Sequence, residues 1–172
     1  MKVVTGIDLS WSGTGIVTGN NPEKPDFVTS IKMNQHNKKH AMSVFRESLS
    51  TETTNLYVIE GLGNYYKDSI SVIPLAKLMG LLELFLEDTK AKIIYIAPTQ
   101  LKKFITGDGT ARKDKIMKDV YKRWGFDPKD SNEADAYGLF KIGHCLVNCV
   151  GELIKPQRDV LDNIHNKYKL IL

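Results

Sequence analysis

Short apolar runs separated by turn-forming residues open the chain and predict β-strands. The first run covers residues 3–8 and is rich in β-branched side chains. Two further runs, at residues 15–18 and 27–31, follow turns that contain Gly and Pro. Because short connections of this kind join neighbouring antiparallel strands, we expect the three segments to form a meander.

The pattern then changes to alternating helices and strands. It predicts a helix with apolar residues one turn apart, a short apolar strand, a long apolar helix and a second apolar strand. These elements cover residues 40–49, 56–60, 70–86 and 93–97. Strands that are separated by helices pair in parallel, because the chain must cross over between them.

Helices are predicted for most of the remaining chain. Residues 112–124 are amphipathic, and Gly125 is a typical helix stop. Residues 130–133 resemble a capping box that opens a further helix, and the polar tail after Pro156 suggests a separate short helix. The summed order predicts an α/β domain with a mixed five-stranded sheet, three antiparallel strands and then parallel ones, flanked by helices.

Length and composition fit one domain that covers residues 1–172. The chain is 42% hydrophobic, which is enough to bury a core without disulfide or metal staples. Cys145 and Cys149 lie in a predicted helix and are interpreted as small apolar side chains. No signal-peptide pattern precedes the first strand, and no apolar run is long enough to span a bilayer. We therefore expect a cytoplasmic protein with no membrane partner.

Basic residues are concentrated in one part of the chain. The formal net charge is +4, but residues 90–129 hold eleven Lys and Arg against four Asp, a local charge of +7. Such a segment is either a solvated helix face or a surface that binds a polyanion, and the charge pattern leaves both interpretations open.

Three acidic residues stand where core elements begin or end. Asp8 ends the first strand, Glu60 ends the strand at residues 56–60, and Asp135 interrupts an Ala-rich helix beginning. Each alone is equally typical of a strand end or cap residue that faces water. A buried carboxylate without a partner is costly, however, so three such residues together indicate pairing with cations or a metal ion.

These carboxylates meet at one point if the first and fourth strands are neighbours and the last long helix crosses them there. Carboxylate oxygens with no His or Cys nearby in sequence suit Mg²⁺, with Mn²⁺ as a substitute, better than zinc. A pair of such ions can activate water and stabilise the leaving oxygen of a phosphoryl displacement.

Four motifs in order, covering residues 2 to about 143, resemble those of RuvC-type Holliday junction resolvases. They are Gly6-Ile7-Asp8, Val58-Ile59-Glu60, the run 98–113 with its Gly-x-Gly turn between two lysines, and Asn132-Glu133-Ala134-Asp135. The resemblance implies a ribonuclease H-like fold of the retroviral integrase superfamily, with a helical extension at the C-terminal end.

The resemblance also implies that Asp8, Glu60 and Asp135 hold one or two Mg²⁺ ions per subunit. The family places a further Asp where this chain has Asn132, which can ligate through its carbonyl oxygen without supplying charge. Glu133 is the alternative ligand, although it suits a cap role and its angular offset from Asp135 on a helix argues against it. The position stays open.

Lys102 and Lys113 match the family's two lysines. The resemblance implies that they contact the scissile or flanking phosphates and offset charge in the transition state, whereas the alternative is ordinary surface lysine. The other predicted DNA contacts beside this motif are Lys103, Arg112 and Lys115. Tyr65 and Tyr66 follow the fourth strand and are predicted either to stack on unpaired bases at a crossover or to pack at the rim.

The implied activity is magnesium-dependent nicking of a four-way DNA junction, in a bacterial cell or a phage-infected host, without a nucleotide cofactor. The nicks leave 5′-phosphate and 3′-hydroxyl ends. Because the junction is nearly two-fold symmetric and needs two nicks, we expect a homodimer. The apolar helix at residues 70–86 is interpreted either as a dimer contact or as core, and the residues concerned are Leu78, Leu81, Leu82 and Phe85.

Three other functions fit parts of the pattern. An actin-like or sugar-kinase ATPase also begins with Gly-Ile-Asp and a Gly-Thr turn, but it needs two such domains around the nucleotide. A ribonuclease H that cuts RNA–DNA hybrids shares the carboxylates, but the motif with Lys102 and Lys113 speaks against it. A DNA-binding protein with weak catalysis is suggested by Asn132.

Overall fold

Five strands, counted over the described residues, lie in one mixed sheet. The computed structural model describes residues 1–50, 52–63, 69–148 and 152–169. The strands are β1 (Val4–Asp8), β2 (Thr14–Gly19), β3 (Phe27–Ile31), β4 (Leu56–Glu60) and β5 (Lys92–Ile96), in the spatial order β3-β2-β1-β4-β5. The first three pair antiparallel, and β1, β4 and β5 pair in parallel. The predicted meander and parallel part are confirmed.

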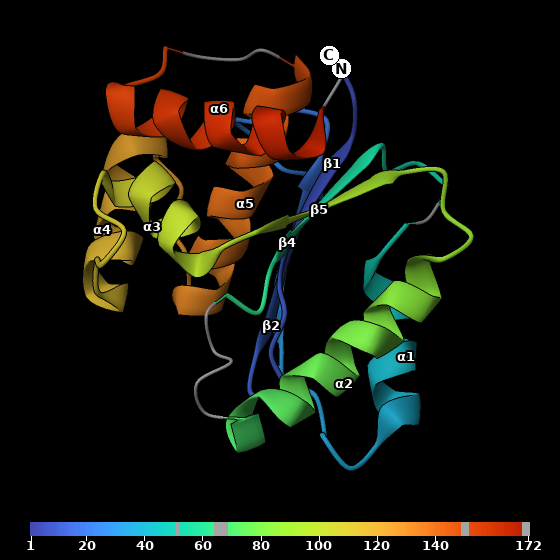
Figure 1. The fold of residues 1–172 in the computed structure, drawn as a ribbon. Coiled ribbons are helices and arrows are strands. Elements are labelled where there is room, and N and C mark those ends of the chain that lie inside the picture. The colour runs from blue at the N-terminus through green and yellow to red at the C-terminus, as the bar shows by residue number, and fades with distance from the viewer. Residues whose placement is uncertain (51, 64–68, 149–151, 170–172) are drawn as a thin grey trace.

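Helices cover both faces of this sheet (Figure 1). They are α1 (Lys38–Ser48), α2 (Ser69–Leu86), α3 (Pro98–Thr106), α4 (Lys113–Trp124), α5 (Ser131–Asn148) and α6 (Lys155–Tyr168). α1 and α2 lie on one face, and α3, α4, α5 and α6 lie on the other. The sheet thereby separates two hydrophobic cores, one under each helical layer.

Side chains of β1 and β4 alternate between the two cores, as the pleat of a strand requires. Val4 and Val58 face the core under α5, whereas Ile7 and Ile59 face the core under α2. This alternation decides which side of the sheet the carboxylates at the strand ends occupy.

α2 is the most apolar helix, and its inner face belongs to the chain's own core. Leu78 and Leu82 are fully buried, and Leu81 and Phe85 pack against the same cluster. For Leu78 and Leu82 the predicted dimer contact is therefore wrong, and the alternative of core burial is correct. Among the described residues, no helix combines the length and apolarity needed to cross a membrane.

Two helices differ from the sequence prediction. α3 was not predicted, although Pro98 occupies its first turn and Gly107 ends it in the left-handed region at φ 82°. α6 was predicted only as a short helix in a polar tail, yet it has 14 residues and buries an apolar stripe. α3 was missed because Pro98 also suits the end of a strand. The length of α6 was underestimated because its charged residues suggest a solvated tail.

The backbone of α5 lies unusually close to the sheet, because glycines occupy the strand positions beneath it. A Cβ on Gly6 would lie 2.3 Å from the carbonyl oxygen of Ala136, and one on Gly15 would lie 2.2 Å from that of Asn132. Side chains cannot occupy such positions without moving the backbone of α5. The absence of a side chain at Gly6 therefore lets α5 approach β1 two residues before Asp8.

We expect Gly6→Ala to lower the free energy of unfolding by about 3 kcal/mol, because the added methyl group overpacks a contact between two backbones. Urea unfolding measures this loss. Gly61→Ala is the control: its Cβ would meet Tyr95 Cβ at 3.4 Å, an ordinary contact, so its change should stay within about 1 kcal/mol. Equal losses for both variants would contradict the close approach of α5.

Candidate active site

Two carboxylates come from the ends of neighbouring parallel strands. Ile7 of β1 is in register with Ile59 of β4, so Asp8 and Glu60 follow at the same edge of the sheet. Both side chains share the face of Val4 and Val58, which is the face that α5 covers. The sequence analysis made the meeting of these carboxylates conditional on neighbouring first and fourth strands, and the observed pairing of β1 with β4 meets that condition.

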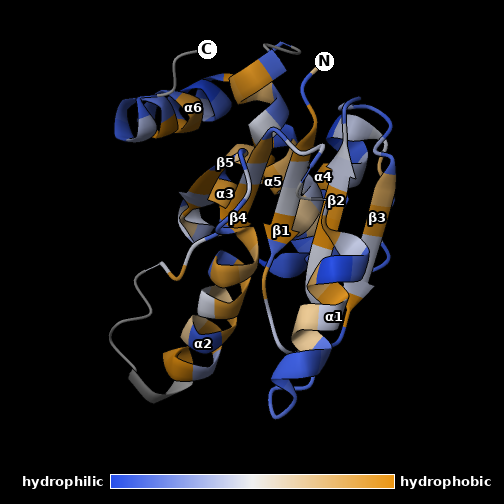
Figure 2. Cartoon of the chain, turned by 90° about the vertical axis from the view of Figure 1, so that its right-hand side faces the viewer, coloured by the Kyte–Doolittle hydropathy of each residue, from blue (hydrophilic) through white to orange (hydrophobic). Residues whose placement is uncertain are grey.

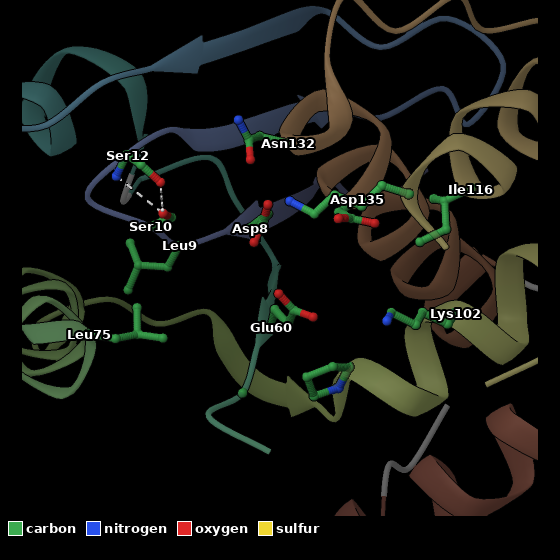
Figure 3. Close-up of a pocket in the computed structure, with 13 residues that line it drawn as sticks. Asp8, Leu9, Ser10, Ser12, Glu60, Leu75, Lys102, Ile116, Asn132 and Asp135 are labelled. Atoms are coloured by element: carbon green, nitrogen blue, oxygen red, sulfur yellow. Dashed lines mark hydrogen bonds between the residues drawn. The ribbon is translucent and has the colours of Figure 1, made fainter. Parts of the chain in front are cut away.

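The second turn of α5 contributes the third carboxylate. Asp130 begins the helix, with its Oδ1 accepting hydrogen bonds of 2.9 Å from the backbone N–H groups of Asn132 and Glu133. Asp135 follows one turn later and points into the same pocket as Asp8 and Glu60 (Figure 3). The predicted cap at Asp130 is confirmed, and it fixes where Asp135 lies.

Asn132 and Glu133 point in different directions. Asn132 lies on the pocket wall, and its Nδ2 reaches Ser30 Oγ at 3.4 Å, which turns its carbonyl oxygen toward Asp8 (Figure 3). Glu133 is 3% exposed, and its Oε2 accepts a hydrogen bond of 2.9 Å from Lys129 N. Glu133 is thus held in the cap and is outside the pocket, so the geometry favours Asn132 of the two alternatives.

Two lysines close the opposite side of the pocket. Lys102 comes from α3, and Lys113 is the first residue of α4. The pocket has a volume of about 280 Å³ and is open to solvent. It is lined by Asp8, Leu9, Ser10, Ser12, Glu60, Gly61, Leu75, Pro98, Lys102, Lys113, Ile116, Asn132 and Asp135. All five residues predicted to act in catalysis therefore meet in one cavity.

The carboxyl groups of Asp8 and Glu60 are close enough to share a proton. Burial raises the pKa of Asp8 well above its ordinary value, and the negative charges of Glu60 and Asp135 and a hydrogen bond to Glu60 raise it further. Burial also raises the pKa of Glu60, whereas the hydrogen bond from Asp8 and the charges of Lys102 and Lys113 lower it. Both carboxyl groups therefore hold a proton to a higher pH than exposed carboxyl groups do.

Asp135 carries an unsatisfied buried oxygen. Burial, followed by the charge of Glu60, raises its pKa to about 7, although Lys113 and Lys102 act in the opposite direction. Its Oδ1 atom is buried with no hydrogen-bond partner among the described residues. Such an atom is costly to desolvate unless something positive contacts it. A cation in the pocket would satisfy this oxygen and relieve the repulsion that raises the pKa values of Asp8 and Asp135.

The residues fit a hard divalent cation. The donors are three carboxylates and one amide oxygen, which is the oxygen-rich set that Mg²⁺ and Mn²⁺ prefer. No three His, Cys, Asp or Glu side chains of the described residues are already gathered as a metal cluster. An ion held there would offset the negative charges that these carboxylates bring together.

The other predicted DNA contacts are not gathered in the pocket. Lys103 Nζ pairs with Asp159 of α6 at 3.1 Å, and Lys115 Nζ pairs with Asp119 at 2.6 Å. Arg112 is exposed at the beginning of α4 and stays a predicted DNA contact. The predicted contacts Tyr65 and Tyr66 lie outside the described residues.

Some pocket residues were not singled out from the sequence. Ser10 and Ser12 line the turn after β1, where their hydroxyl oxygens lie 2.8 Å apart. Thr14 Oγ1 accepts a hydrogen bond from Ser10 N and donates one to Ser10 O, which holds this turn beside Asp8. Hydroxyl residues shortly after Asp8 were the available signal, and two of them, Ser10 and Ser12, line the pocket.

The arrangement of sheet and helices defines a ribonuclease H-like α/β fold, as predicted. No protein-family model and no curated protein matches the sequence. Solved structures do match: RuvC of Thermus thermophilus has a TM-score of 0.66 at 16% identity, covering 88% of this chain and 99% of that one. T. thermophilus RuvC in complex with a Holliday junction substrate has a TM-score of 0.63 at 17% identity, covering 82% and 92%. The chain shares the RuvC fold.

We expect the stability of the metal-free protein to fall as the pH rises from about 4 to about 7. Over this range Asp135 is ionised in the unfolded chain but holds its proton in the folded one, so folding binds protons. Asp135→Asn should weaken this dependence and raise the melting temperature at pH 8. Added Mg²⁺ should stabilise the wild-type protein more at pH 8 than at pH 5, because protons compete for the same oxygens.

Thermal melts at both pH values, with and without Mg²⁺, measure these shifts. Asp127→Asn, at an exposed position outside the pocket, is the control and should respond as the wild-type protein does. A Mg²⁺ response that is equally large in the Asp135→Asn protein would contradict the assignment of the ion to this pocket.

Proposed function

We propose that the chain is an endonuclease that uses divalent cations to nick branched DNA, with a four-way junction as its substrate. One observation carries the proposal: Asp8, Glu60 and Asp135 converge with Lys102 and Lys113 in one open pocket. The fold is shared with a RuvC that has been solved in complex with a Holliday junction substrate, which supports this choice of substrate.

The acidic side of the pocket would hold one or two Mg²⁺ ions through Asp8, Glu60 and Asp135, with the amide oxygen of Asn132 as a neutral fourth donor. Ions bound there supply an activated water and offset the charge of the leaving oxygen. An uncharged ligand at Asn132 lowers the negative charge of the site by one relative to an Asp, and it relieves part of the repulsion among the carboxylates.

The basic side of the pocket would bind the phosphodiester. Lys102 and Lys113 line the same cavity as the carboxylates, and Figure 3 shows Lys102 facing them. The two ammonium groups would contact phosphate oxygens and stabilise the charge that develops there. Water adds to phosphorus, and the bond from phosphorus to the 3′ oxygen breaks. The 3′ oxygen leaves as a hydroxyl group and the phosphate stays on the 5′ end, so DNA ligase can reseal the nick.

We expect Asp8→Asn and Asp135→Asn to lower the rate of junction nicking about a thousand-fold, while junction binding without divalent cations is unchanged or tighter because a negative charge is lost. Lys102→Ala should slow nicking about a hundred-fold. Single-turnover cleavage of a four-way junction with Mg²⁺ and gel-shift binding in EDTA measure the two effects.

Asp127→Asn serves as the control, and ligase treatment of the products checks the end chemistry. A linear duplex, an RNA–DNA hybrid and ATP are assayed in parallel. Cleavage of the hybrid but not of the junction would replace the proposal with a ribonuclease H activity, and ATP hydrolysis without DNA would favour the kinase-like alternative.

We also propose a homodimer that pairs through the outer face of α2. The exposed residues Ile73, Ala76, Gly80 and Leu84 recur at helical spacing on that face, and Ile73 and Leu84 are 50% and 62% exposed. Figure 2 looks onto this layer and shows hydrophobic residues on the visible side of α2. A Cβ on Gly80 would meet nothing within 4 Å, so packing within the chain does not require this glycine.

A glycine inside a helix costs about 1 kcal/mol relative to alanine, so one that fills no need within the chain suits a position where another helix approaches closely. Self-pairing of α2 across a two-fold axis would cover the apolar strip. It would also join two copies of the pocket, which is the number that a two-fold symmetric junction requires.

We expect Leu84→Glu to convert a dimer into a monomer, because it places a charge in the paired strip. Sedimentation velocity at micromolar concentration measures the mass of the species. Arg46→Glu, an exposed charge change on α1, is the control and should leave the dimer intact. A wild-type chain that sediments as a monomer, or a Leu84→Glu dimer, would overturn this interface.

A further inference from the structure

α6 packs against the helix that carries Lys102. Its buried stripe consists of Gln157, Val160, Leu161 and Ile164, and the apolar members join the same core as Phe104 and Ile105 of α3. Figure 1 shows α6 lying across one end of the layer formed by α3, α4 and α5. α6 lines no part of the carboxylate pocket, so any influence on the site must pass through the helices it packs against, which are chiefly α3 and also α5.

An ion pair between Lys103 of α3 and Asp159 of α6 joins the two helices. Lys103 Nζ lies 3.1 Å from Asp159 Oδ2, and the two side chains are 38% and 41% exposed. At this exposure an ion pair adds little stability, but it does hold Lys103 toward α6. Successive residues on a helix are about 100° apart, so Lys103 facing α6 leaves Lys102 directed toward the carboxylates.

A second contact holds the segment that leads into α3. β5 is an edge strand, and Tyr95 lies on its unpaired side. The backbone N–H of Tyr95 donates to the Tyr168 hydroxyl oxygen at 2.9 Å, and that hydroxyl donates to the Tyr95 carbonyl at 3.0 Å. One phenol therefore takes the place of a neighbouring strand, only three residues before Pro98, which lines the pocket and begins α3.

We propose that α6 is a brace that sets the position of Lys102 in the active site, with Asp159 and Tyr168 as its positioning residues. Tyr168 fixes the start of α3, and Asp159 fixes its rotation. A helix that only covered the edge of the sheet would need the apolar stripe but neither polar contact. For its catalytic readout this inference rests on the proposed nuclease function; its structural readout does not.

The geometric part is tested by hydrogen exchange on the metal-free protein. Tyr168→Phe removes both hydrogen bonds to Tyr95 and keeps the ring, and Asp159→Asn removes the ion pair and keeps the shape. In both variants the backbone amide hydrogens of residues 98–106 should exchange several-fold faster than in the wild-type protein. The exchange rates of residues 113–124 should be unchanged. Tyr121→Phe and Asp162→Asn, the same substitutions at exposed positions, are the controls. Unchanged exchange in α3 overturns the brace.

The catalytic part is tested by a double-mutant cycle on single-turnover junction nicking. Tyr168→Phe and Asp159→Asn should each slow nicking about ten-fold when Lys102 is present, because small misplacements of a catalytic group are costly. In the Lys102→Ala protein the same substitutions should change the rate less than two-fold, since the group they position is gone. Urea unfolding confirms that each protein is folded under the assay conditions.

The outcomes separate the two proposals. If the wild-type protein nicks no junction, the proposed function fails, and hydrogen exchange alone decides whether α6 braces α3. If the wild-type protein nicks and the brace substitutions slow the Lys102→Ala protein by the same factor as the wild type, the effect does not pass through Lys102 and the brace is wrong. Non-additive effects on the nicking rate, together with faster hydrogen exchange in α3, establish the brace.

Discussion

The structure depends on how three carboxyl groups are kept next to one another and away from water. Burial raises the pKa values of Asp8, Glu60 and Asp135, and the charges of neighbouring carboxylates raise those of Asp8 and Asp135 further. A fold keeps such an arrangement only if stronger contacts hold the elements that carry it. Here the contacts are the parallel pairing of β1 with β4 and the close approach of α5 over Gly6, which no side chain obstructs.

The remaining elements can be understood from that constraint. α3 and α4 bring Lys102 and Lys113 to the other side of the pocket, where their charges partly counter the raised pKa values. An acidic side and a basic side across one open cavity suit a substrate that is itself anionic and a cation that lies between the two. α6 packs against α3. Under the proposed brace, a helix outside the four motifs therefore affects the position of Lys102.

The sheet and the carboxylate cluster could be predicted from the sequence because both follow from local patterns. Side chains alternate between the two cores along β1 and β4. In the register of this parallel pair, Asp8 and Glu60 lie at the same edge of the sheet. The orientation of Asn132 could not be predicted, because it depends on Ser30, a tertiary contact. Glu133 is held by a local contact with Lys129 N, in keeping with the cap role that the sequence suggested. The ion pair of Lys103 with Asp159 could not be predicted, because the two residues are 56 positions apart in sequence. Leu78 and Leu82 could be assigned to the core only once α2 was seen against the sheet.

The central claim is that Asp8, Glu60 and Asp135 close around a divalent cation. Anomalous diffraction from crystals soaked in Mn²⁺ at pH 8 tests it most directly, because the signal locates the ion independently of any activity. We predict a peak within ligating distance of oxygens from all three side chains, and its loss in the Asp135→Asn protein. A peak confined to other acidic residues, or none at a Mn²⁺ concentration that supports junction nicking, would contradict the account.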